Sequence, residues 1–473
     1  MFSLKLTIYG GAGEIGGNKI LVESDATRVF LDYGVSYTIK SMYFSTFLQP
    51  RRFNLLGDYL ITGVLPSIQG IYRPEMLGGE LTHLNSDSPS VEACIISHAH
   101  LDHCGHASFL RQDIPLYMGE GTKVLISARE EAKQPSPEHI FNRGRYGGGR
   151  GCTTFRTGER FAVGDIMIEP VHVDHSIPAA YGLILESPDN VLAYTGDFRM
   201  HGPMSHMSWD FINRCREKGV ETIVVEGTRI GDNLAHSEET VRNTLTNLIA
   251  DAGSCMVAAV VGPLDFDRLK SLLQACLAND RALVISLHHA HILKSLSRAG
   301  LSMEIPKMEF DVLVTYQKRK GSGRYVDKDY RYWEAEILND QSIPLLKDAE
   351  ISANPDRYVL AMSRAEDIVG LASLKPPPSS LFILSTSEPH SEEQVLEMDK
   401  IENWARLLGM RFHHIHASGH ASGSDIVKVI EAIEPQKIVP IHTQHPEMFE
   451  LLIQERGMEC SVIIPRYGVD VMV

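Results

Sequence analysis

A short polar segment near residue 100 contains four side chains that could bind metal ions. It reads Ser97-His98-Ala99-His100-Leu101-Asp102-His103 and directly follows the apolar run Ala93 to Ile96. If that run is a strand, His98 and His100 point to one side where the strand ends, and Asp102 and His103 lie on the turn beyond it. Imidazole and carboxylate groups are common ligands of divalent transition metals. The spacing therefore predicts that one segment contributes to two neighbouring metal positions, and the alternative is an exposed polar turn.

Further ligands must come from other parts of the chain, because each such ion takes roughly four to six ligands. His175, Asp197 and His442 each follow an apolar run within a few residues, ending at Val173, Tyr194 and Ile441. A ligand at a strand end is held rigidly, and a carboxylate at Asp197 could bridge both ions. Alone, each of these residues would more often be a surface or helix-capping residue. Together with the first segment they favour a dinuclear metal site.

The elements that position these residues form two patterns. Over the first two hundred residues, short β-rich runs alternate with Gly, Asp and Ser, which indicates a largely antiparallel layered sheet. From about Glu221 onward, the apolar runs Thr222 to Glu226, Ala282 to Ser286 and Leu381 to Ser385 alternate with amphipathic helices, the first of which opens at Ser237. This second pattern is typical of a parallel α/β domain. No role can be assigned to residues 36–90.

Composition limits the class of protein. The chain has 473 residues, of which 43% are hydrophobic, and its net charge is −15. This length suggests two or three domains, and the charge excludes a generally basic nucleic-acid coat protein. Seven widely spaced cysteines without a CxxC pair argue against a disulfide framework or a thiolate zinc site. With no apolar run of membrane-spanning length and no leader pattern, we expect a soluble cytoplasmic protein.

A glycine motif near the N-terminus resembles a nucleotide-binding loop. Gly11-Ala12-Gly13-Glu14-Ile15-Gly16 matches GxGxxG, and Asp32 lies at a plausible distance for a ribose-binding carboxylate. A dinucleotide fold needs a helix to begin at this loop, whereas Asn18 to Glu23 and Arg28 to Asp32 have the pattern of two strands. A glycine-rich hairpin is therefore the preferred interpretation.

These residues together resemble the metallo-β-lactamase fold, and the α/β insertion before the last ligand resembles its β-CASP nuclease branch. Within that branch the chain is most similar to ribonuclease J of the short, archaeal type, without the extra C-terminal domain. The motifs that carry this resemblance are Gly10 to Asn18, His175-Ser-Ile-Pro178, Tyr194-Thr-Gly-Asp-Phe-Arg199 and His416-Ala-Ser-Gly-His-Ala-Ser422. The resemblance implies an α/β fold, with a four-layer αββα metallo-β-lactamase domain and an inserted parallel α/β β-CASP domain. The expected boundaries are 1–210 and 406–473 for the former and 211–405 for the latter.

The resemblance also implies roles for individual residues. His98, His100 and His175 would hold one zinc ion, Asp102, His103 and His442 the other, with Asp197 between them. Asp102 would also orient the attacking water, His420 would give a proton to the leaving ribose oxygen, and Glu226 would be the acidic residue of the insert's first motif. Ser418 and His416 would contact the phosphate.

The implied activity is that of a zinc-dependent ribonuclease, since two zinc ions lower the pKa of a shared water and stabilise charge on a phosphodiester. We expect a 5′-to-3′ exonuclease, with endonuclease activity as well, that acts in RNA processing or decay. The partner would be RNA rather than a membrane, and a homodimer is one assembly open to the chain. Manganese in place of zinc stays an alternative. So do a DNA-directed nuclease, a small-ester hydrolase with the same site, and a non-catalytic RNA-binding protein.

Two basic clusters are candidates for phosphate contacts in a chain that is otherwise acidic. The first consists of Arg143, Arg145, Arg150 and Arg156, and the second of Lys318, Arg319, Lys320 and Arg324, with Tyr146 and Tyr325 as candidates for base stacking. A solvated loop is the alternative for both clusters.

Overall fold

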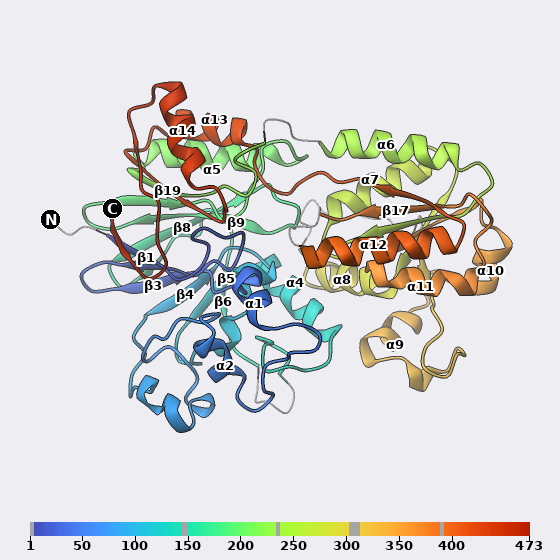
Figure 1. Cartoon of the computed structure of the whole chain (residues 1–473), viewed down its shortest axis with the longest axis horizontal. Coiled ribbons are helices and arrows are strands. Elements are labelled where there is room, and N and C mark those ends of the chain that lie inside the picture. The colour runs from blue at the N-terminus through green and yellow to red at the C-terminus, as the bar shows by residue number, and fades with distance from the viewer. Residues whose placement is uncertain (1–3, 144–148, 233–236, 302–312, 388–391) are drawn as a thin grey trace. The chain divides into compact units, whose positions relative to one another are not determined.

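The computed structural model describes residues 4–143, 149–232, 237–301, 313–387 and 392–473. The chain forms two compact units (Figure 1). The first unit comprises Met1–Ala235 and Gly419–Val473, and the second unit comprises His236–Ser418. The second unit is therefore an insertion in the sequence of the first.

Within the described residues, the first unit contains two seven-stranded sheets. The first sheet has the spatial order β21 (Asp470–Met472), β1 (Lys5–Ile8), β2 (Ile20–Glu23), β3 (Arg28–Leu31), β4 (Ala93–Ile96), β5 (Leu116–Gly119) and β6 (Thr153–Phe155). The second sheet has the order β20 (Ser461–Val462), β19 (Lys437–Ile441), β11 (Thr222–Glu226), β10 (Val191–Tyr194), β9 (Ala180–Glu186), β8 (Ile166–Val173) and β7 (Phe161–Val163). The backbone N–H of Tyr181 donates to Ser97 O at 3.1 Å, so the end of β4 meets the start of β9.

Both sheets of the first unit are mixed rather than largely antiparallel. In the first sheet, β21 to β3 are antiparallel neighbours and β3 to β6 are parallel. In the second, β7 to β10 are antiparallel, and β10, β11, β19 and β20 are parallel. The prediction is wrong for the parallel halves because parallel neighbours require long crossovers, such as the one between β3 and β4, which strand patterns do not reveal.

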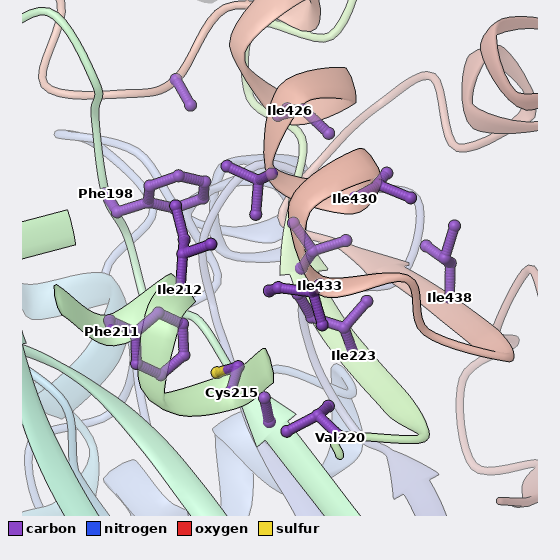
Figure 2. Close-up of a cluster of buried hydrophobic side chains, with 14 of the residues drawn as sticks. Phe198, Phe211, Ile212, Cys215, Val220, Ile223, Ile426, Ile430, Ile433 and Ile438 are labelled. Atoms are coloured by element: carbon purple, nitrogen blue, oxygen red, sulfur yellow. The ribbon is translucent and has the colours of Figure 1, made fainter. Parts of the chain in front are cut away.

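Helices cover the outer face of each sheet in the first unit. Three of them pack against the second sheet: α5 (Ser205–Glu217), α13 (Gly423–Ile433) and α14 (Glu447–Arg456). Figure 2 shows Ile433 of α13 beside Ile223 of β11 and Ile430 and Ile426 further along the same helix, in one cluster with Phe211 and Ile212 of α5. This three- and four-residue spacing of isoleucines gives α13 one apolar face, and burying each of them contributes about 1.5–3 kcal/mol.

The other helices of the first unit come from the connections of the first sheet. They are α1 (Tyr37–Tyr43), α2 (Leu55–Ile61), α3 (Leu101–Cys104) and α4 (Glu120–Glu131). In Figure 1, α1, α2 and α4 lie on the opposite side of the two sheets from α5, α13 and α14. The layers are therefore helix, sheet, sheet, helix, as predicted.

The second unit is a parallel α/β structure, also as predicted. Its sheet has the order β15 (Leu345–Leu346), β14 (Leu313–Tyr316), β13 (Ala282–Ser286), β16 (Tyr358–Met362), β12 (Val257–Val261), β17 (Leu381–Ser385) and β18 (Arg411–His414), and all neighbours run parallel. Its helices are α6 (Glu238–Asp251), α7 (Phe266–Leu277), α8 (Leu287–Arg298), α9 (Tyr332–Leu338), α10 (Asp348–Ala353), α11 (Ile368–Leu371) and α12 (Glu392–Leu407). Ser237 caps α6, since its side chain accepts from the N–H of Thr240. Among the described helices, none is both long and apolar enough to cross a bilayer.

The boundaries of the insertion differ from the expected 1–210, 211–405 and 406–473. β11 pairs with β10 and β19 and so belongs to the first unit, whereas β18 pairs with β17 and belongs to the second. The insertion therefore begins and ends later than expected, at His236 and Ser418. An apolar run that forms a parallel strand has the same pattern in either sheet, so only pairing distinguishes them.

Candidate metal centre

The segment after β4 is fixed by backbone hydrogen bonds to two other loops of the first unit. The N–H groups of Asn18, Tyr33 and Val35 donate to the carbonyls of Asp102, His103 and Leu101 at 3.0, 2.8 and 2.9 Å. Helix α3 begins directly after His100 and contains Asp102 and His103. The chain therefore turns from strand to helix within the motif, which directs its side chains into one small volume.

Four of the predicted ligands form a first group. The Nδ1 atom of His100 lies 3.0 Å from His98 Nε2 and 3.1 Å from His175 Nε2. The Oδ2 atom of Asp197 lies 3.6 and 3.8 Å from the same two Nε2 atoms. His98, His175 and Asp197 are fully or almost fully buried. Their ligand atoms all lie within 4.8 Å of one another.

A second group lies on the other side of Asp197. It consists of Asp102, His103 and His442, and His442 Nε2 is 3.2 Å from Asp102 Oδ2. Asp197 Oδ2 lies 3.1 Å from His103 Nε2 and 3.6 Å from His442 Nε2. One carboxylate oxygen is thus close to histidines of both groups. The structure brings together all seven residues for which the sequence predicts ligand roles.

The donor atoms suit a divalent cation. A tetrahedral zinc ion with bonds of 2.0–2.1 Å places its ligands about 3.3 Å apart, which is close to the spacings in both groups. His103 Nε2 and Asp197 Oδ1 are buried and make no hydrogen bond in the structure. Burial lowers the pKa of His98, His100 and His175 below the usual 6.5, to about 4 for His100. These rings are therefore neutral, as metal binding requires.

His103 differs from the other histidines in its charge. Burial lowers its pKa, but the negative charges of Asp197 and Asp32 outweigh this effect and raise the pKa well above 6.5. The two carboxylates therefore favour a positive charge at this point. A divalent cation supplies such a charge without a proton on the ring.

Each of four ligand histidines has a hydrogen-bond partner on its outer nitrogen. Nδ1 of His103 lies 2.7 Å from Asp32 Oδ2, and Nδ1 of His175 lies 2.6 Å from the carbonyl of Gly419. The Nδ1 atoms of His98 and His442 lie 3.0 and 2.8 Å from the hydroxyls of Ser97 and Thr228 respectively. A carbonyl or carboxylate accepts from Nδ1–H, which leaves a lone pair on the Nε2 atoms of His103 and His175.

Asp32 is a functional candidate that sequence reasoning considered only as a ribose ligand. It is completely buried, with φ 60°, a backbone region in which non-glycine residues are strained. Besides His103, its carboxylate accepts from the N–H and hydroxyl of Ser97 at 2.7 and 2.8 Å and from the Tyr194 hydroxyl at 2.5 Å. The signal that could have identified it is its position directly after an apolar strand, like the predicted ligands.

The glycine motif forms a wall of this site and opens no helix. The N–H of His442 donates to Gly11 O at 2.7 Å, which holds His442 at φ 54°. Gly16 has φ +76°, and a Cβ there would lie 2.5 Å from Asp102 Oδ2. The backbone must therefore approach Asp102 closely, which explains this glycine without a nucleotide.

His420 and Glu226 form a pair beside the second group. His420 Nδ1 lies 3.2 Å from Glu226 Oε1 and 3.9 Å from Asp197 Oδ2, and its side chain is 21% exposed. Glu226 is completely buried and also accepts from the N–H groups of Thr228 and Ala421 at 3.0 and 3.3 Å. Burial lowers the pKa of His420, but the charges of Glu226 and Asp197 prevail and raise it to about 9. Together with Asp197 and His442, His420 also forms a third group with metal-ligand spacing.

Two predicted substrate contacts belong to the other unit. His416 and Ser418 lie in the second unit, just before the chain returns to the first. Their proposed contact with a phosphate therefore stays a prediction.

Most described residues of the two basic clusters form hydrogen bonds or ion pairs within the protein. Arg143 is completely buried and donates to the carbonyls of His139 and Ser108 at 2.9 and 3.0 Å, and the buried Arg150 donates to those of Ala107 and Leu110 at 3.2 Å. Arg156 pairs with Glu120. In the second unit, Lys318, Arg319 and Lys320 form ion pairs with Asp367, Asp348 and Glu334. Arg145 and Tyr146 lie outside the described residues. Arg143 and Arg150 thus satisfy backbone carbonyls, a role that the sequence alone does not reveal.

Comparison with known proteins agrees with this geometry. Residues 73–254 match the Beta-lactamase superfamily domain, and residues 408–464 match the Zn-dependent metallo-hydrolase RNA specificity domain. Among curated proteins, Ribonuclease J of Helicobacter pylori (strain J99 / ATCC 700824) is 22% identical over 94% of this chain and 56% of its own length. Ribonuclease J of Mycoplasma genitalium is 20% identical over 97% of this chain and 70% of its own length. The resemblance to ribonuclease J is thus confirmed.

A solved structure shows the same fold. The crystal structure of a protein of unknown function from Enterococcus faecalis V583 superimposes with a TM-score of 0.75, at 22% identity and with complete coverage of both chains. The predicted metallo-β-lactamase fold with an α/β insertion is therefore confirmed. This chain spans about half the length of the first of its ribonuclease J relatives.

Proposed function

We propose that the chain is a ribonuclease that hydrolyses RNA phosphodiesters with two divalent metal ions, zinc or alternatively manganese. The observation that carries this proposal is the convergence of six other ligand residues around one buried carboxylate, Asp197. The match to an RNA specificity domain and the similarity to ribonuclease J support RNA as the substrate.

Two groups of side chains would hold the ions. We assign His98, His100 and His175 to one ion and Asp102, His103 and His442 to the other, with Asp197 shared between them. Two bound cations would act as Lewis acids towards the phosphoryl oxygens and make a water molecule more acidic. Asp32 and the Gly419 carbonyl keep His103 and His175 in the required tautomer, and the Ser97 and Thr228 hydroxyls help to orient His98 and His442.

Three side chains, one of them also a metal ligand, would move or hold protons. Asp102 is 21% exposed and would accept a hydrogen bond from the attacking water as well as bind metal. His420 is partly exposed, and its bond from Nδ1 to Glu226 would direct Nε2 towards the leaving ribose oxygen, to which it would give a proton. Glu226 is buried beneath His420 and would act through it, as a positioning residue.

The family resemblance supports finer expectations. We propose 5′-to-3′ exonuclease activity together with endonuclease activity, in RNA processing or decay in the cytoplasm. His416 and Ser418 would contact the phosphate, and a homodimer is the assembly to be tested.

The experiment combines metal analysis with product mapping. Elemental analysis of the purified protein is expected to find two zinc or manganese ions per chain. End-labelled RNA, DNA and a thioester are then offered separately, and the RNA carries either a 5′ monophosphate or a 5′ triphosphate. Cleavage of RNA that stops after chelation and resumes with added metal supports the proposal. Activity confined to the thioester or to DNA would refute it.

A further inference from the structure

The segment Tyr33 to Gly57 has a composition that differs from the rest of the chain. It contains no Asp or Glu, although the chain as a whole carries a net charge of −15. It contains three cationic residues, Lys40, Arg51 and Arg52. Six of its 25 residues are aromatic, compared with 7% of the whole chain. Most of it falls within the region 36–90, to which the sequence assigned no role.

Several of these aromatic side chains face solvent. Phe47 and Phe53 are 99% and 96% exposed, and Tyr37 and Tyr43 are about half exposed. Single exposed apolar residues are normal, but a concentration of large ones in one segment usually marks an interaction site. Met42 is exposed in the same segment. We call residues 37–53 the aromatic segment.

The aromatic segment is held in place by contacts that leave these rings outside. The ring of Phe44 packs edge-on against the buried Tyr59, with centroids 5.8 Å apart. The hydroxyl of Ser45 accepts from the N–H of Leu48 at 3.2 Å, and Arg51 makes three bonds to Asp58, from its N–H, Nε and Nη2, at 2.6, 2.8 and 2.5 Å. Phe47 and Phe53 therefore lie on the outside of a loop whose backbone is held in place by these contacts.

The aromatic segment begins at the edge of the metal centre. Tyr33 and Val35 donate backbone hydrogen bonds to His103 and Leu101 of the ligand motif. The hydroxyl of Ser36 then accepts from the N–H of Ile39 and so caps α1, the seven-residue helix that starts the segment. At 1.5 Å per residue, this helix is about 10 Å long, and it starts two residues after Val35. A polymer bound at the metal centre could therefore continue along the segment.

We propose that the aromatic segment is a stacking platform for single-stranded RNA that leads to the metal centre. This inference rests on the proposed function of that centre. Every base has a flat face that stacks on aromatic side chains, and the carboxylates beside the segment, Glu138 and Asp58, are paired with its own Lys40 and Arg51, which reduces repulsion of phosphates. The guanidinium of Arg52 lies 5.9 Å from the centroid of the Phe53 ring, where it can contact a phosphate beside a stacked base.

Stacking rather than charge provides most of the binding on this platform. Lys40 already pairs with Glu138 at 3.5 Å, and Arg51 pairs with Asp58. Their charges are therefore largely compensated by neighbouring carboxylates. This favours single-stranded over double-stranded nucleic acid, because only unpaired bases offer their faces. It also distinguishes the platform from the basic grooves that bind duplexes through phosphates.

Binding of a fluorescein-labelled oligouridylate with a phosphorothioate backbone, followed by anisotropy, tests the platform. Phe47→Ala and Phe53→Ala are each expected to weaken binding roughly five- to a hundredfold, with little change when salt is raised. Arg52→Gln should reduce the slope of log affinity against log salt by about 0.7. Trp209→Ala, which removes a 40% exposed aromatic side chain of α5, is the matched control and should bind like the wild type.

Three outcomes separate this inference from the proposed function and from a protein interface. Hydrolysis of bis(p-nitrophenyl) phosphate, which is too small to reach the platform, should be unchanged in the Phe variants. A wild-type protein that cleaves RNA, with Phe variants that bind it equally well, overturns the platform alone, whereas a wild type that neither binds nor cleaves RNA overturns the proposed function. If sedimentation shows that the Phe variants break up an oligomer while their RNA affinity is unchanged, the segment is an interface between copies of the chain instead.

Discussion

Replacing Asp32 with Asn tests whether the outer hydrogen bonds of the site control metal binding. Asp32 Oδ1 accepts from the Ser97 N–H, and an Asn carbonyl can retain this bond. The Asn NH2 group then replaces Oδ2. In the wild type, Oδ2 accepts from His103 Nδ1, the Ser97 hydroxyl and the Tyr194 hydroxyl. The two hydroxyls can rotate and become acceptors, but His103 Nδ1–H cannot.

The substitution therefore forces a different tautomer on His103. Its proton must move to Nε2, the atom that lies 3.1 Å from Asp197 Oδ2 and that would bind metal. To bind a metal ion at Nε2, the ring has to return its proton to Nδ1. There the amide NH2 group of the introduced Asn offers no acceptor. Loss of such an outer partner typically weakens metal affinity by about 10- to 100-fold, equivalent to about 1.4–2.7 kcal/mol.

Competition with a chromophoric chelator measures the zinc affinity of the Asp32→Asn variant directly. Thr157→Val is a control, because it also removes the hydrogen-bond partner of a histidine Nδ1, here a hydroxyl 2.8 Å from His172 Nδ1, at a histidine outside the ligand groups. The control should bind zinc like the wild type. Equal zinc affinities for the Asn variant and the wild type would show that His103 does not depend on Asp32 for its tautomer, and the reasoning would fail.

Three other predictions address catalysis, metal retention and stability. His420→Ala should keep its metal content and RNA affinity but lose turnover by roughly 100-fold or more, measured by single-turnover cleavage; unchanged cleavage would remove His420 from the mechanism. Asp197→Ala should lose bound metal by elemental analysis, since Oδ2 lies within 3.1–3.8 Å of ligand nitrogens in both groups, and full occupancy would contradict its shared position. Burial lowers the pKa of Lys19 from 10.5 to about 8. Between these two pH values the unfolded chain binds more protons than the folded chain. The free energy of unfolding therefore rises with pH across this window, by up to about 3 kcal/mol from this residue. Chemical denaturation at pH 7 and pH 10 should show a smaller rise for Lys19→Met than for the wild type, and equal rises would contradict the buried charge.

The sequence was most informative where the chemistry is local to a strand end. β4 and β11 have the bounds that the apolar runs predict, and β8, β10 and β19 end at Val173, Tyr194 and Ile441 as expected. A ligand immediately after such a run is placed by only a few residues of backbone. That is why the positions of His98, His175 and His442 could be inferred before any contact was known.

The sequence was least informative where pairing between distant segments decides the structure. β11 and β18 exchange their expected domains because neither the apolar β11 nor the polar β18 carries a local signal for one sheet, and only long-range pairing selects it. The arginines at 143 and 150 illustrate the same difficulty, since a glycine-rich basic stretch is typical of an exposed phosphate contact or a solvated loop. In the structure both side chains are buried against carbonyls.

Asp32 shows why the outer partners are harder to predict than the ligands themselves. Its sequence context, an acidic residue after a strand, fits a ribose ligand as well as a histidine acceptor, and the choice depends on where His103 and Tyr194 come to lie. Their side chains reach Asp32 only because β3 pairs with β4 in parallel and the start of β9, the strand next to β10, meets the end of β4. The strained backbone of Asp32 is then maintained by four hydrogen bonds that no single segment provides. A local sequence pattern can therefore predict which groups would bind metal. The tautomers that allow them to bind depend on contacts that form only in the folded first unit.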